Sequence, residues 1–106
     1  MDPMYPALTQ LLGGYFHADW SSAAGRSDAV LAAMVRDEPI ERLRAGLAEL
    51  DALLARGLCE PQLRDVVLYE IGCHIAPERE GLDTSAWLAK VRESIRRRVF
   101  TRTTGE

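Results

Sequence analysis

Apolar stripes bounded by helix-starting and helix-ending residues restrict this chain of 106 residues to a mainly helical fold. In the clearest case Pro39 precedes the stripe and Gly57 follows it, as at the first position and just after the end of many helices. Apolar side chains at spacings of three and four fall on one side of an α-helix. The pattern therefore predicts a helix over 39–56. Its apolar stripe comprises Ile40, Leu43, Leu47, Leu50 and Leu54.

The same pattern recurs twice towards the C-terminus. Pro61 and Gly72 bound a predicted helix over 61–71. After a loop over 73–82 that contains proline and glycine, a further helix is predicted over about 84–100. The predicted core positions of these two helices are Leu63, Val66, Val67, Ile71, Trp87, Leu88, Val91, Ile95 and Val99.

The first third of the chain predicts two shorter helices. One runs over about 6–15, where Gly13 and Gly14 weaken its far end, and the other runs over about 28–36 with Ser27 as its cap. Their predicted core positions are Leu8, Leu11, Leu12, Val30, Leu31, Met34 and Val35.

These predictions amount to an all-α fold, a single compact bundle of about five helices. The bundle is expected to span residues 1–100, and the polar tail over 101–106 is expected to fray. The longest apolar runs are about four residues, far below the ~20 of a membrane helix, and the first residues carry no signal-peptide pattern. We therefore expect a cytoplasmic protein without membrane contact.

Metal binding and catalysis are not expected. Two cysteines, Cys59 and Cys73, suit free thiols in a reducing compartment, and one disulfide between them is the alternative. With His17, Asp19 and His74 they lack the close pairs typical of zinc sites. The sequence also holds no phosphate-binding loop and no recognisable partner for a nucleophilic thiol. We predict no cofactor, no metal and no enzymatic activity.

Charge is divided unevenly along the chain. Residues 1–89 hold seven basic and fourteen acidic side chains, a net charge of −7, whereas residues 90–106 have a net charge of +4. An acidic body repels nucleic acid and attracts a basic protein. The alternative is a nucleic-acid-binding protein or a small helical adaptor. The arginines that would then contact phosphates are Arg92, Arg96, Arg97, Arg98 and Arg102. Because three of these are consecutive, they spread around a helix, and we do not expect nucleic acid as the partner.

The block Tyr15-Phe16-His17-Ala18-Asp19-Trp20 is the most unusual stretch of the sequence. Together with the leucine helix before it, it resembles the opening of the small helical immunity proteins of contact-dependent growth inhibition systems. The resemblance covers about residues 5–93. In that family a glutamine usually stands where this chain has Ala18.

The resemblance implies that the chain binds and neutralises the C-terminal toxin domain of a growth-inhibition exoprotein, and such toxins are frequently nucleases. A nuclease active site binds phosphate and is commonly basic, so the net charge of −4 over 60–83 is suited to it. Buried aromatic anchors would supply affinity, with Tyr15, Trp20, Tyr69 and Trp87 as candidates. The predicted toxin-binding residues are Tyr15, His17, Asp19, Trp20, Glu70, Glu78, Glu80 and Asp83.

Overall fold

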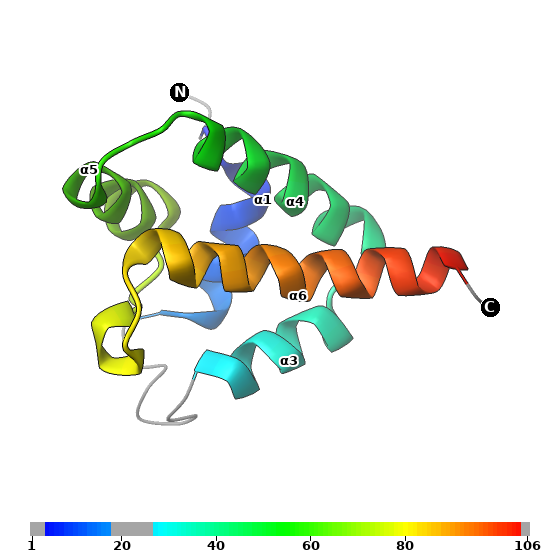
Figure 1. Ribbon diagram of the computed structural model, residues 1–106. Coiled ribbons are helices and arrows are strands. Elements are labelled where there is room, and N and C mark those ends of the chain that lie inside the picture. Colours follow the sequence, from blue (N-terminus) through cyan, green and yellow to red (C-terminus); the bar gives the residue numbers. More distant parts are fainter. Residues whose placement is uncertain (1–3, 18–26, 105–106) are drawn as a thin grey trace.

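The protein is a bundle of helices, as predicted from the sequence (Figure 1). The computed structural model describes residues 4–17 and 27–104, and within these two stretches it contains no strand. The elements in chain order are α1 (Pro6–Leu8), η1 (Thr9–Gly13), α3 (Ser27–Asp37), α4 (Ile40–Ala55), α5 (Glu60–Asp65), η2 (Val66–Ile71), η3 (Pro77–Glu80) and α6 (Thr84–Thr104). Because η1 continues α1 and η2 continues α5, the described residues form five helices and the short 3-10 helix η3.

The predicted helix boundaries agree with the structure to within a few residues. Pro39 lies just before α4, and Gly57 follows that helix with a φ of 66°, a conformation that glycine adopts without strain. Gly72 ends η2 in the same way, with a φ of 80°. The helix α6 runs to Thr104, four residues beyond the predicted end at residue 100.

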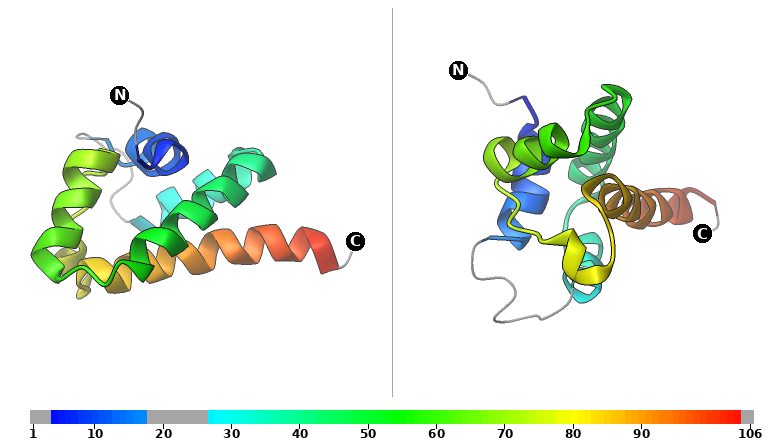
Figure 2. Two further views of the ribbon diagram at one scale, coloured as in Figure 1. Left: turned by 90° about the horizontal axis from the view of Figure 1, so that it is seen from above. Right: turned by 60° about the vertical axis from the view of Figure 1, so that its left-hand side comes forward.

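The longest helix, α6, lies between α4 and α3 (Figure 1) and contacts both of them as well as α5. Figure 2 shows α1 against α4 and the C-terminal end of α6 projecting from the bundle. The apolar stripes predicted for α5, η2 and α6 are buried in full. All five predicted positions of α6 lie in the core, and this helix packs against α3, α4 and α5.

The core-facing side of α4 differs from the prediction. Leu53 and Gly46 are buried, whereas Leu47 and Leu54 of the predicted stripe are only half-buried. A Cβ atom on Gly46 would lie 2.5 Å from Cδ1 of Leu11. The glycine therefore permits a close approach between α4 and η1, and this approach turns α4 away from the orientation that its leucines alone indicate.

Two aromatic rings from distant parts of the sequence contact each other in the core. Phe16 and Trp87 meet edge to face with ring centroids 5.2 Å apart. The indole Nε1 of Trp87 donates a hydrogen bond of 3.1 Å to Oγ of Ser27. Since Trp87 is fully buried, its suggested role as an anchor for a partner is wrong.

Candidate partner-binding surface

The segment that ends in His17 lies against the loop that follows η2. The backbone N–H of His74 donates to the carbonyl oxygen of Phe16 over 2.7 Å, and the side chains of His17 and His74 are both exposed. The helical segments η1 and η2 are also in close contact. A Cβ atom added to Gly13 would lie only 2.6 Å from the carbonyl oxygen of Ile71. The structure thus joins the described part of the aromatic block, residues 15–17, to the acidic span over 60–83.

A second connection lies at the start of α3. Both the backbone N–H and the hydroxyl of Ser27 donate to the carboxylate of Glu80, over 3.2 and 2.7 Å. Residues 17 and 27 are therefore each held near the loop between η2 and α6. The predicted binding residues Asp19 and Trp20 lie outside the described residues.

The π-helical segment η2 exposes an aromatic side chain beside a carboxylate. Tyr69 is 77% exposed, the most exposed large hydrophobic residue among those described, and Glu70 next to it is also exposed. π-Helical turns are rare and are found frequently at functional sites. We use the name acidic end for the exposed aromatic, histidine and acidic residues of this turn and of the segment between it and α6, together with His17, whose neighbour Phe16 is hydrogen-bonded to that segment. It comprises His17, Tyr69, Glu70, His74, Glu78 and Asp83.

The carboxylates of the acidic span have different partners. Glu78 is exposed and pairs with Arg64 over 2.6 Å. Asp83 is exposed and accepts a hydrogen bond of 2.8 Å from the backbone N–H of Ala86, which caps α6. Glu60 accepts from the backbone N–H and the hydroxyl of Thr84 at the same helix start. Two of the six acids of this span, Glu60 and Glu80, thus hold the starts of helices together.

Glu80 has a lowered pKa. Burial by itself would raise the pKa of this carboxyl, but the two hydrogen bonds from Ser27 and the ion pair with Lys90 outweigh it and hold the pKa below 4.5. Lys90 lies 3.3 Å from Glu80 and also pairs with Asp28. A carboxyl group with a lowered pKa in the folded state stabilises the fold at neutral pH and loses this effect as the pH falls through that pKa.

Glu80→Gln is therefore expected to lower the free energy of unfolding by about 1–2 kcal/mol at pH 7, because it weakens hydrogen bonds to a charged acceptor. The difference from the wild type should shrink as the pH falls below about 4.5. Urea denaturation of both proteins between pH 3.5 and 7 measures this difference in the free energy of unfolding. Glu78→Gln is the matched control, since the pair with Arg64 is exposed and is expected to contribute at most about 0.5 kcal/mol. A difference that grows on acidification would contradict this account.

Tyr15 points to another part of the molecule. Its hydroxyl donates to the carboxylate of Glu38 over 2.8 Å, next to the junction of α3 and α4. Burial and the carboxylate of Glu38 raise the pKa of Tyr15 to about 12. The described contacts therefore place the Tyr15 hydroxyl apart from the exposed carboxylates of the acidic end.

The surroundings of Cys73 are not those of a reactive thiol. Cys59 is exposed and Cys73 is buried, and both are free, so the alternative of a disulfide between them is wrong. Burial raises the pKa of the Cys73 thiol, which disfavours the nucleophilic thiolate. Across 4–17 and 27–104, no three histidine, cysteine or acidic side chains are grouped in a way that could hold a metal ion. The described residues contain no helix with the length and the hydropathy that a membrane span requires.

Two features of this surface are not predicted by the sequence. The sequence marks His74 only as a candidate metal ligand, and its position beside His17 depends on a backbone hydrogen bond between residues 58 positions apart. The π-helical geometry of η2 has no sequence signal that we can identify, although Tyr69 does fall outside the buried positions of that helix.

The family model described as CdiI immunity protein matches residues 4–95. Among solved structures, a chain in the crystal structure of a CdiA-CT/CdiI complex from Y. kristensenii 33638 matches with a TM-score of 0.78 and 32% sequence identity. The match covers 87% of this chain and 98% of that one. No curated protein sequence matches this chain.

Proposed function

We propose, from the premise that this chain belongs to the CdiI immunity protein family, that its acidic end contacts the toxin which it neutralises. The family match over residues 4–95 is the observation that carries the function. The partner is the cognate toxin domain, the C-terminal part of a contact-dependent growth inhibition exoprotein, in line with the CdiA-CT/CdiI complex that the similar structure contains.

The acidic end has the chemistry expected of a surface that binds a basic enzyme. Glu70, Glu78 and Asp83 are exposed carboxylates, and carboxylates attract the cationic groups with which a nuclease binds phosphate. Electrostatic attraction raises the rate of encounter, whereas affinity depends mainly on a few aromatic anchors. Tyr69 has the exposure and the neighbouring charge of such an anchor.

We infer that the toxin is a nuclease and that the immunity protein covers its active site, with carboxylates in place of substrate phosphates. Inhibition of this kind needs no chemistry from the immunity protein, so we propose that it has no catalytic activity. It would act in the cytoplasm, where a delivered nuclease reaches its substrate. Binding outside the active site, with substrate entry blocked, is the alternative mechanism.

The charge contribution can be tested by removing three carboxylates together. Glu70→Gln, Glu78→Gln and Asp83→Asn in one chain are expected to slow association with the purified toxin domain by about three- to tenfold at low salt. The dependence of the association rate on salt should become shallower, because fewer charges attract the toxin. Stopped-flow or surface plasmon resonance measurements over a range of salt concentrations give both values.

A second triple variant separates location from net charge. Asp37→Asn, Glu41→Gln and Asp51→Asn change the net charge by the same amount on exposed residues of α3 and α4, outside the acidic end. This control should associate at nearly the wild-type rate. Equal slowing in both variants would contradict a role for the acidic end. A wild-type chain that fails to neutralise its cognate toxin domain would overturn the function.

A further inference from the structure

One carboxylate of the acidic end is paired with a cation of the same chain. Arg64, in the last turn of α5, donates to the carboxylate of Glu78 in η3 over 2.6 Å. The two residues are 14 positions apart in the sequence, and their side chains are 49% and 60% exposed. Among the described residues, neither Glu70 nor Asp83 forms an ion pair with a cationic side chain. The chain itself therefore neutralises one of the three exposed carboxylates with which the acidic end would attract a basic toxin.

This ion pair is one that another cation can replace. Pairs between exposed side chains contribute little to stability, because water screens the charges and both side chains lose conformational freedom. Half of the Arg64 side chain is exposed, so its guanidinium can turn into solvent without any movement of the backbone. Opposite charges attract each other more strongly where a protein partner excludes water than at an open surface. A toxin cation that covers Glu78 is therefore able to displace Arg64.

We propose that Arg64 competes with the toxin for Glu78, and that a cationic side chain of the toxin displaces it when the complex forms. This role rests on the proposed contact between the toxin and the acidic end. The pair holds the Glu78 carboxylate in the free protein, but it must break before Glu78 can bind the toxin. Removal of Arg64 should therefore strengthen binding, whereas removal of a residue that contacts the toxin should weaken it.

The substitution Arg64→Gln tests the competition. Arg64 also lines a small cavity of about 40 Å³ with Val67 and Pro77, and glutamine keeps the part of the side chain nearest the backbone. We expect the dissociation constant for the purified cognate toxin domain to fall about three- to fivefold at about 150 mM salt, where long-range effects of net charge are largely screened. In a chain that already carries Glu78→Gln, the same substitution should change the dissociation constant less than about twofold, because no carboxylate remains to be released. Isothermal titration calorimetry of the four proteins measures both effects.

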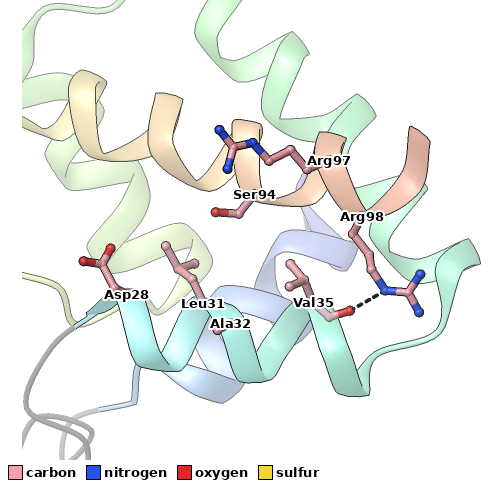
Figure 3. A pocket seen from close by; sticks show the side chains of 7 residues that line it. All are labelled: Asp28, Leu31, Ala32, Val35, Ser94, Arg97 and Arg98. Atoms are coloured by element: carbon pink, nitrogen blue, oxygen red, sulfur yellow. Dashed lines mark hydrogen bonds between the residues drawn. The ribbon is translucent and has the colours of Figure 1, made fainter. Parts of the chain in front are cut away.

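Two other arginines provide matched controls for the loss of one positive charge. Arg79 is exposed and adjacent to Glu78 in η3, and it forms no ion pair within 4–17 and 27–104. Arg97 pairs with Glu93 over 3.2 Å and lies outside the acidic end, beside a groove between α3 and α6 (Figure 3). Arg79→Gln and Arg97→Gln should each leave the dissociation constant within about twofold of the wild type. All three single variants should have nearly wild-type free energies of unfolding in urea.

An Arg64→Gln chain that binds the toxin domain no more tightly than the wild type would overturn the proposal, and so would an equal gain in the Glu78→Gln background. Weaker binding would also overturn it, because Arg64 would then contact the toxin itself. If the triple carboxylate variant associates more slowly but Arg64→Gln gives no gain, only the role of Arg64 is rejected. If neither variant changes toxin binding, the acidic end is rejected as the toxin contact as well.

Discussion

Trp87→Ala is expected to lower the free energy of unfolding by about 3–5 kcal/mol, a large fraction of the total stability of a domain of this size. Trp87 is fully buried, meets the ring of Phe16 edge to face and donates a hydrogen bond to Ser27. Its removal leaves a large cavity and an unoccupied acceptor on Ser27, whose hydroxyl also holds Glu80. Urea denaturation followed by far-ultraviolet circular dichroism measures the loss.

Tyr69→Ala is the control for this experiment, because it also removes an aromatic ring but from a side chain that is 77% exposed. Its free energy of unfolding should stay within about 0.5 kcal/mol of the wild type. Its affinity for the toxin domain should fall by at least about tenfold, mainly through faster dissociation. If both variants lose the same free energy of unfolding, the prediction for Trp87 is wrong. If Tyr69→Ala binds the toxin domain with wild-type affinity, Tyr69 is not part of the toxin contact.

Gly13→Ala is expected to destabilise the protein by about 1–3 kcal/mol. The added Cβ would lie 2.6 Å from the carbonyl oxygen of Ile71, and a backbone atom cannot move aside as a flexible side chain can. Either η1 or η2 must shift, and a shift of η2 displaces Tyr69 and Glu70. Toxin affinity should therefore fall together with stability, which urea denaturation and a binding titration will show.

The neighbouring glycine provides the matched control. A Cβ on Gly14 meets nothing within 4 Å, and its backbone has helical angles, with φ −73° and ψ −38°. Gly14→Ala should therefore raise the free energy of unfolding by up to about 1 kcal/mol, since alanine restricts the unfolded chain and favours a helix. If both substitutions changed the free energy of unfolding in the same direction, the close approach between η1 and η2 would not be the reason for a glycine at position 13.

The sequence predicts the helices well because their signals are local. Pro39, Gly57 and Gly72 lie at or next to helix ends, and the stripes of α5, η2 and α6 face the core as their spacing indicates. The rotation of α4 is not predictable in this way. It depends on a contact between Gly46 and Leu11, which are distant in sequence, and a glycine in a helix otherwise indicates only a loss of helix propensity.

The candidate surface is predicted only in part, for a related reason. A count of charges over 60–83 correctly locates an acidic region, but it cannot distinguish Glu70, whose side chain is exposed, from Glu80, which is bound to Ser27 and Lys90. Which carboxylates remain available to a partner depends on contacts between segments far apart in the chain. The positions of His17 and His74 depend on such contacts too.

The π-helical turn at η2 has a consequence for how related proteins diverge. Such a turn contains one residue more than an α-helix of the same rise requires, so a single-codon deletion within Val66–Ile71 would return it to α-helical geometry. Because the π turn absorbs the extra residue within itself, that deletion would leave the residues before and after the turn in phase and would change which side chains the turn exposes. One insertion or deletion event can thus change which side chain stands at the exposed position of Tyr69 while Leu63 of the preceding helix α5 keeps its place in the core.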